Sequence, residues 1–352
     1  MIKFFRKIRQ NLLSEKQTSK YFKYAIGEIV LVVIGILIAL QINNWNEKRK
    51  NENKITTVLK EIQKDLEEDI VKSKALFTYY NKRDSIIQLA LDNKLTRENY
   101  LSANRHEFIY VAMNAFHLKI HNNGYKKLTD NIDNIPEKYQ ELISPLNEIY
   151  TYNKYEIDKF DIRIDKVTDR LIDKLAASKP WYHGLYENIS DDAIHFFLND
   201  SLYKNDLDIY RNASGNLGRH ISSFNQNASN VYRTIAELTG YPKTLPDFIP
   251  HHLIEPTPQD LEAIIGNYKM VKFTTPTGEV MPLNEPITIK AGKYSLELTI
   301  VNSSNTIFLY YKSTTELYDE EATSTLVKND KNQVVKIIAK YDDGEAELIK
   351  IE

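Results

Sequence analysis

The chain has 352 residues, of which 42% are hydrophobic and none is cysteine, so disulfide bonds and thiolate chemistry are excluded. The formal net charge is −2, but residues 1–24 carry +6 and the remainder −8. An acidic main part argues against nucleic-acid binding. This length allows an anchor and two modest domains.

The first predicted element is a basic leader, residues 1–24, where seven lysines and arginines stand against Glu15 alone. Short basic segments beside a membrane span stay on the cytoplasmic side. Apolar residues recur in the leader at helical spacing. The leader therefore either lies on the inner leaflet, attracted to anionic lipid, or is a topogenic tail without specific binding.

Residues 25–45 are predicted to form a transmembrane helix. The apolar run 25–42 would be roughly 27 Å long, which nearly spans a ~30 Å hydrocarbon core. Tyr24 and Trp45 would set one aromatic ring at each interface, and no small-residue cleavage pattern follows the run. We expect an uncleaved, single-pass anchor in the inner (cytoplasmic) membrane, with the N-terminus cytoplasmic, the later domains periplasmic, and membrane lipid as a partner.

A glutamate interrupts the apolar run. At 100° per residue, Gly35 and Ala39 fall within about 20° of Glu28, and a Gly-x-x-x-Ala face permits close approach of another helix. We predict that Glu28, Gly35 and Ala39 form an intramembrane contact with a second copy or another membrane-protein subunit. The alternative is a lipid-facing anchor whose glutamate reaches the interface.

Beyond the anchor, apolar residues at three- and four-residue steps predict amphipathic helices over roughly 55–91, 99–121, 146–171 and 207–238. None could bury its apolar stripe alone, so residues 46–240 are predicted to form an antiparallel helical bundle. Coiled-coil pairing between chains, in a homo-oligomer, would bury the same stripes. The sequence does not choose between these two arrangements.

The C-terminal part has a different pattern. Residues 241–258 contain five prolines, which predicts an extended linker. Over residues 259–352 the apolar period falls to two, in short runs with predicted hairpin turns at 342–344 and 329–332. This predicts a small antiparallel β domain, closed as a barrel or open as a curved sheet.

Two resemblances add to this interpretation. The opening FFRKIRQNLL, followed by YAIGEIVLVVIGILIALQINNWNE, resembles a family of uncharacterised single-pass membrane proteins from flavobacteria and other Bacteroidota. The segment NNGYKKLTDNI sits like that family's short glycine-containing segment between helices. The resemblance implies an anchored helical ectodomain and no assigned activity.

The second resemblance covers roughly the last 93 residues. The segment DLEAIIGNYKM and the ending STLVKNDKNQVVKIIAKYDDGEAELIKIE resemble the β tail module of many penicillin-binding-type serine hydrolases. Such enzymes use S-x-x-K, Y-x-N and K-T-G-like motifs. Residues 201–204 and 186–188 match the first two, but in the wrong order and 15 residues apart, and no third motif follows. We therefore expect no catalytic residues and no cofactor.

Two parts of the sequence contain residue types that bind metals. His117 and His121 are four residues apart and would share one face of a helix, as in a two-histidine metal site, but no H-E-x-x-H glutamate lies between them. Core or surface histidines are the simpler interpretation, so no metal is expected. The four aspartates in residues 158–169 alternate with lysines and arginines, which predicts a solvated, ion-paired helix face.

Two classes of function remain. The favoured one is a non-enzymatic, membrane-anchored envelope protein whose helical ectodomain presents a β module for protein or ligand binding or for assembly. The alternative is an accessory subunit or degenerate relative of an envelope serine hydrolase.

Overall fold

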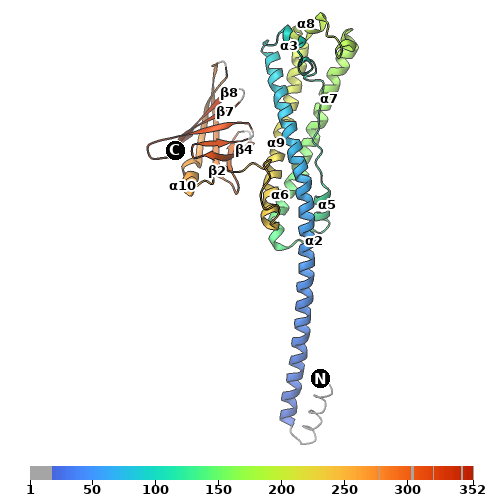
Figure 1. The fold of residues 1–352 in the computed structure, drawn as a ribbon, viewed down its shortest axis with the longest axis vertical. Helices are drawn as coiled ribbons and strands as arrows, with labels where there is room; N and C mark the ends of the chain where they lie inside the picture. The colour runs from blue at the N-terminus through green and yellow to red at the C-terminus, as the bar shows by residue number, and fades with distance from the viewer. Residues whose placement is uncertain (1–17, 277, 303–304, 320, 342–343, 352) are drawn as a thin grey trace.

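The computed structural model describes residues 18–276, 278–302, 305–319, 321–341 and 344–351, excluding the side chains of residues 18–21, 24 and 305 (Figure 1). Residues 1–17 of the predicted leader and two residues of the predicted 342–344 turn lie outside this description. The predicted fold class is confirmed: a long apolar helix is followed by further helices and then by an antiparallel β domain.

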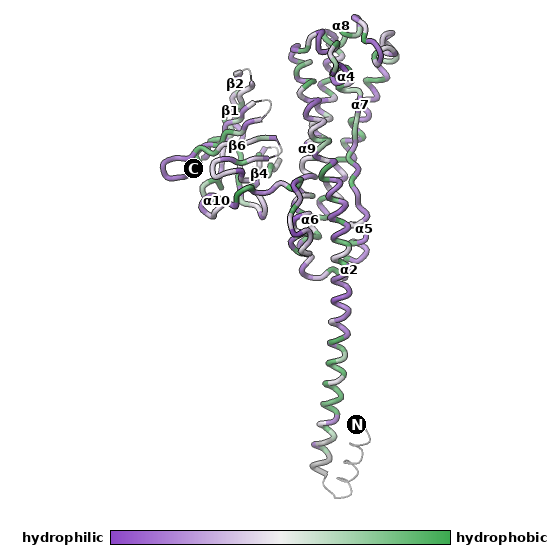
Figure 2. The backbone as a smooth tube through the Cα atoms, viewed as in Figure 1, coloured by the Kyte–Doolittle hydropathy of each residue, from purple (hydrophilic) through white to green (hydrophobic). Residues whose placement is uncertain are grey.

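Helix α2 runs without interruption over Thr18–Leu91, 74 residues. Residues 25–42 are apolar apart from Glu28 and Gln41 (Figure 2), and they are mostly exposed. A stripe of buried residues begins at Ile55. A helix that is apolar all round suits lipid, and a one-sided stripe suits a bundle. Among the described residues, α2 is the helix long and apolar enough to cross a membrane, and none of its apolar window is buried inside the protein.

Three long helices form the body of the bundle: α2, α7 (Lys154–Ser178) and α9 (Ser201–Thr239). Helix α9 packs along α2 and buries Leu217, Ile221 and Phe224 completely. The shorter elements are α3 (Arg97–Leu101), α4 (Arg105–Ile109), α5 (Asn123–Thr129), η1 (Ile132–Asn134), η2 (Glu137–Leu142), α6 (Ile143–Asn147), the π-helical η3 (Glu148–Asn153), η4 (Tyr182–Gly184) and α8 (Asp191–Asn199). The predicted apolar stripes are thus buried within a single chain.

The prediction of one helix over residues 99–121 is wrong. Helices α3 and α4 occupy only its first part, and residues 114–122 have no regular secondary structure. Side chains of α2 explain this. The Arg83 guanidinium donates to the carbonyl oxygens of Tyr110 and Val111. The Tyr80 hydroxyl donates to the carbonyl of Phe116, at 2.7 Å, and accepts from its amide, at 3.1 Å. These backbone groups are therefore satisfied without a helix.

The β domain is a closed barrel in which eight antiparallel strands, all formed by described residues, follow one another and β1 also pairs with β8. The strands are β1 (Gly266–Thr274), β2 (Val280–Ala291), β3 (Leu296–Ile300), β4 (Asn305–Ser313), β5 (Glu316–Tyr318), β6 (Thr323–Lys328), β7 (Val334–Tyr341) and β8 (Gly344–Ile351). Apolar side chains such as Tyr268, Leu309 and Val334 fill the interior as a packed core. The predicted turn at 329–332 is present, with Asn332 at a φ of 60°.

Residues 241–257 connect bundle and barrel without helix or strand and contact both. Ile249 is fully buried in the bundle core, while the Leu253 amide donates to the Tyr311 carbonyl of β4 at 2.7 Å. Helix α10 (Pro258–Ile264) then packs Ile264 into the barrel core. The proline-rich segment is therefore tied at both ends to folded structure.

Candidate functional site

The predicted membrane-helix face lies on the part of α2 that protrudes from the bundle (Figure 1). Gly35 and Ala39 are exposed there, and no described atom lies within 4 Å of where a Cβ on Gly35 would stand. The absence of a side chain at Gly35 is thus not required by packing within this chain. Glu28 is partly exposed on the same helix.

The predicted interface anchors differ in what can be described. Trp45 is 62% exposed, and the Arg49 guanidinium carbon lies 5.1 Å from the centre of its ring. Tyr24 belongs to α2, but its side chain lies outside the described atoms. Such a ring-and-cation pair is typical of a helix end at a membrane surface.

A cluster of histidines and carboxylates joins the irregular segment 114–122 to two long helices. His121 Nδ1 lies 2.6 Å from Asp69 Oδ1 of α2, and the His121 amide donates to the other oxygen of that carboxylate at 2.8 Å. His117 lies between two carboxylates of α7, 3.3 Å from Asp161 Oδ1 and 3.2 Å from Asp165 Oδ1. The histidines therefore bind different helices, and the prediction that they share one helical face is wrong.

Burial controls the electrostatics of this cluster. It raises the pKa of Asp161 to about 6, although the hydrogen bond and charge of His117 act in the opposite direction. Burial also raises the pKa of Asp69, against the hydrogen bonds from His121. The prediction of a solvated acidic face on α7 is thus wrong at Asp161. No group of three or more metal-ligating side chains occurs among the described residues.

Gly124 fixes the end of the same segment against α2. A Cβ at Gly124 would lie 2.8 Å from the backbone nitrogen of Ile62, and the Gly124 amide donates to Asp65 Oδ2 at 3.2 Å. Only glycine allows this close approach of α5 to α2. This gives a structural role to the glycine of the NNGYKKLTDNI segment.

The residues of the serine-hydrolase motifs lie on a helix and on a loop, and the hydrogen bond of Lys204 goes to a residue outside the motifs. Ser201 is the exposed first residue of α9, and the Lys204 ammonium donates to Asn93 Oδ1. Tyr186 is 75% exposed on the loop between η4 and α8. A serine nucleophile needs its base within hydrogen-bond reach, and here the nearby lysine is directed to a different residue.

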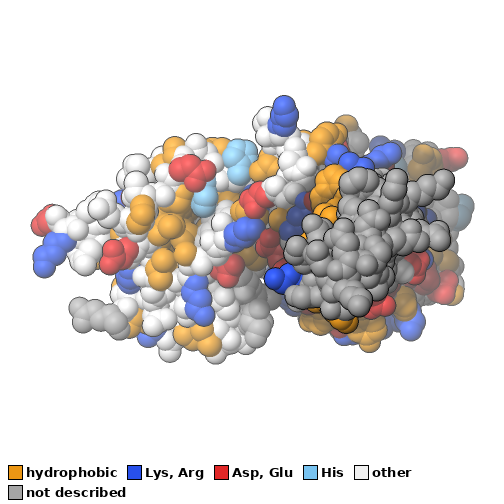
Figure 3. All heavy atoms as spheres, turned by 90° about the horizontal axis from the view of Figure 1, so that it is seen from below, with side chains coloured by type: hydrophobic (Ala, Val, Ile, Leu, Met, Phe, Trp, Pro, Cys, Tyr) orange, Lys and Arg blue, Asp and Glu red, His pale blue; other side chains and the backbone are white. Residues whose placement is uncertain are grey.

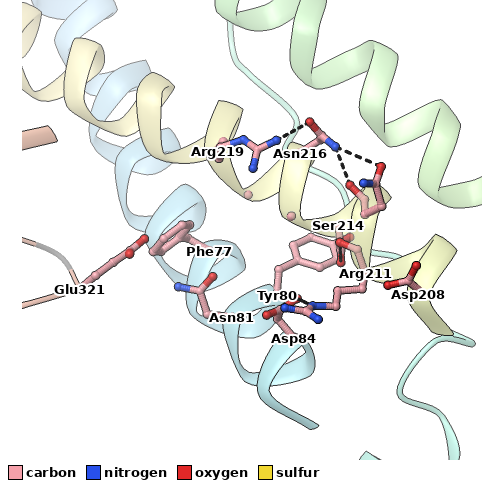
Figure 4. A pocket seen from close by; sticks show the side chains of 13 residues that line it. Phe77, Tyr80, Asn81, Asp84, Asp208, Arg211, Ser214, Asn216, Arg219 and Glu321 are labelled. Atoms are coloured by element: carbon pink, nitrogen blue, oxygen red, sulfur yellow. Dashed lines mark hydrogen bonds and ion pairs between the residues drawn. The ribbon is translucent and has the colours of Figure 1, made fainter. Parts of the chain in front are cut away.

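A groove of about 420 Å³ lies between α2 and α9 and reaches Glu321 of the barrel (Figure 4). Its floor contains Phe77 and Tyr80, and its wall includes an Arg211–Asp84 pair with 3.0 Å between Nε and Oδ1. Two glycines of α9, Gly215 and Gly218, also line it. The walls of this groove are far apart in the chain, so no local sequence pattern predicts it.

Gly215→Ala is expected to raise the free energy of unfolding by about 1 kcal/mol. A Cβ at Gly215 meets no atom within 4 Å, and alanine in a helix interior is more favourable than glycine by about that amount. Thermal unfolding of both proteins in the same detergent measures the difference. A stability at or below that of the parent would show that α9 needs glycine at this position.

Barrel and bundle meet through a polar contact that the sequence did not reveal. The Tyr294 hydroxyl donates to Glu237 Oε2 at 2.8 Å, and Lys293 pairs with the same oxygen at 3.1 Å. Arg233 of α9 is 3% exposed, with its guanidinium 5.2 Å from the Tyr294 ring and 5.3 Å from the Tyr310 ring. Cation–π contacts of a buried arginine favour this docking.

The fold and the protruding apolar helix define a class of protein: a helical bundle and a β-barrel built on one helix that is able to cross a membrane. The model of a family of unknown function, DUF6090, matches residues 28–167. The match therefore begins in the apolar part of α2 and ends within α7, so that α9 and the barrel lie beyond it. No curated protein matches the chain.

Proposed function

We propose that this protein is a non-enzymatic, membrane-anchored envelope protein whose helical ectodomain holds the β-barrel for protein or ligand binding or for assembly. The observation that carries the proposal is that α2 is one continuous helix from the exposed apolar run into the bundle core. The same helix thus serves as anchor and as scaffold.

A continuous helix sets the distance between the membrane and the barrel. No glycine or proline occurs between Trp45 and Leu91, so the usual causes of a kink are absent. Gln63 donates to the Tyr232 carbonyl at 3.2 Å, beside the contact between α9 and the barrel. Eighteen residues separate Trp45 from Gln63, which places this level roughly 27 Å beyond the membrane interface.

The proposed location is the inner membrane, with the leader in the cytoplasm and bundle and barrel in the periplasm. The seven basic residues before the apolar run support this orientation. The resemblance of the opening 47 residues to the Bacteroidota family supports an envelope role. The hydrogen bond from Lys204 to Asn93, and the exposure of Tyr186 on a loop, support a function without serine catalysis.

We further propose that Glu28, Gly35 and Ala39 contact a second copy or another membrane subunit. The open space at Gly35 supports this, because small residues allow two helices to approach closely. A Glu28→Ala, Gly35→Leu double variant is expected to convert a larger complex, extracted in mild detergent, into a single 41.0 kDa chain. Complex mass is measured by light scattering corrected for detergent.

The matched control is a Val33→Ala, Leu37→Ala double variant, since these residues lie about 160° around the helix from Gly35. It should keep the parent's mass. If parent, control and variant all have the mass of one chain, the helix contact is absent and α2 serves as an anchor alone.

A further inference from the structure

The turn at residues 131–134 lies at the end of the bundle that faces the anchor. It packs against α2 directly after the protruding segment. The side-chain amide of Asn51 donates to the Asn134 carbonyl, and Lys54 Nζ lies 2.5 Å from Asn131 Oδ1. After Asn134 the chain turns away from the anchor, because the Tyr139 hydroxyl lies 2.7 Å from Oγ1 of Thr56, farther along α2. The turn is therefore the part of the bundle nearest to the anchor.

The number of residues along α2 gives the height of this turn. Six residues separate Trp45 from Asn51, which is about 9 Å along a helix. The headgroup layer on each side of a bilayer is about 5–8 Å thick. With Trp45 at the membrane interface, the turn lies at the outer edge of the headgroup layer, within reach of a side chain.

The side chains at this level offer an apolar residue and cations to a phospholipid surface, beside the exposed carboxylates of Glu47 and Asp133. Ile132, in the turn, is 48% exposed although it is apolar. Lys48, Arg49 and Lys50 are exposed on α2 between Trp45 and the turn, and as consecutive residues they cover about 200° of the helix circumference. Seen from the anchor side, both basic and acidic side chains lie around the base of the helix (Figure 3).

We infer that the turn 131–134 and the cations Lys48, Arg49 and Lys50 form a second membrane contact, which takes the headgroups of phospholipids. Lysine and arginine pair with lipid phosphate, and Ile132 enters the boundary of the headgroup layer. The inference rests on the proposed membrane span. A contact beside the anchor limits tilting of α2 and so holds the barrel at a constant height.

Tryptophan quenching in phospholipid vesicles tests this contact, because the chain has only two tryptophans. The full-length protein is reconstituted with lipid that carries a nitroxide on its headgroup. Three single-tryptophan proteins are compared. Trp181→Phe keeps Trp45 as a reporter of the anchor, Trp45→Phe keeps Trp181, and Ile132→Trp in the double phenylalanine background reports the turn.

Trp181 is the distant control, since it packs on Phe196 and Phe197 of α8 at the far end of the bundle (Figure 1). We expect headgroup quenching of Trp45 and of the Ile132→Trp reporter, at least twofold stronger than that of Trp181. Replacing Lys48, Arg49 and Lys50 by glutamine should reduce quenching of the Ile132→Trp reporter while leaving that of Trp45 unchanged.

If the Ile132→Trp reporter is quenched no more than Trp181 while Trp45 is quenched, the second contact is refuted and the anchor stands. If Trp45 itself is not quenched, the proposed span fails, and the second contact fails with it. Because Ile132 is half exposed, the substitution is not expected to disturb the fold. Unchanged thermal unfolding of the reporter protein checks this.

Discussion

Gly124→Val is expected to lower the free energy of unfolding by about 3 kcal/mol and to release the segment around α5 from α2. The added Cβ would lie 2.8 Å from the Ile62 nitrogen and 3.1 Å from its Cα. Ile62 is fully buried in the core, so α2 cannot retreat and α5 must move. Overpacking of a rigid core costs 1–3 kcal/mol and sometimes more. Urea unfolding in mild detergent, followed by tryptophan fluorescence in the Trp45→Phe background so that Trp181 alone reports, measures the loss.

The control is Gly184→Val, because a Cβ at Gly184 meets no atom within 4 Å. Its effect is expected to stay within about 0.5 kcal/mol, as for most surface substitutions. Hydrogen exchange of residues 114–129 should also be faster in Gly124→Val. Equal stability of Gly124→Val and the parent would contradict the close approach of α5 to α2.

Asp161→Asn is expected to change the pH dependence of stability. Burial raises the pKa of Asp161 from 3.8 to about 6, so the folded state binds its proton more tightly than the unfolded state. The resulting stabilisation is complete below pH 3.8 and is lost as the pH rises through about 6. The buried carboxylate therefore costs roughly 3 kcal/mol at pH 8 as an upper limit. Asparagine removes this cost, since it stays neutral.

Four charged or titratable groups around Asp161 affect how its stability contribution depends on pH. They are His117 from the irregular segment, Tyr80 from α2, and Asp158 and Asp165 from α7. After the substitution His117 still pairs with Asp165 at 3.2 Å. Asp161→Asn should thus be more stable than the parent at pH 8, with the difference vanishing near pH 4.

Denaturant unfolding at pH 4, 5, 6, 7 and 8 measures this difference. Asp165→Asn is the control, because its side chain is 50% exposed and exposed ion pairs contribute little. It should leave the slope of stability against pH unchanged. An Asp161→Asn protein that loses stability relative to the parent as the pH rises would mean that the His117–Asp161 pair outweighs the burial of its charge.

The sequence predicted the elements whose pattern is local. The heptad stripe of α9 and the period of two in the strands are readable without any partner, because each reflects one buried face. Residues 99–121 misled the prediction because side chains of α2, above all Arg83, replace the helical partners of that backbone. Hydrogen bonds from the side chains of a distant helix leave no periodic pattern in the sequence of the segment that accepts them.

The candidate sites show the same limit. Glu28, Gly35 and Ala39 could be selected because they lie on one helix. The three carboxylates that bind His117 and His121 are 44, 48 and 52 residues away in the chain, so only the fold identifies them. The sequence also gave no reason to select Arg233, whose role depends on two tyrosines of the barrel.

The central claim is that one α2 helix spans the membrane and holds bundle and barrel outside the cytoplasm. Because the chain has no cysteine, single-cysteine variants can be labelled cleanly with a membrane-impermeant maleimide on spheroplasts. Lys331→Cys lies in the exposed turn between β6 and β7, and Ser14→Cys lies in the leader. We expect labelling of Lys331→Cys in intact spheroplasts and of Ser14→Cys only after lysis. Labelling of Lys331→Cys only after lysis would place the barrel in the cytoplasm, which would refute the proposed topology.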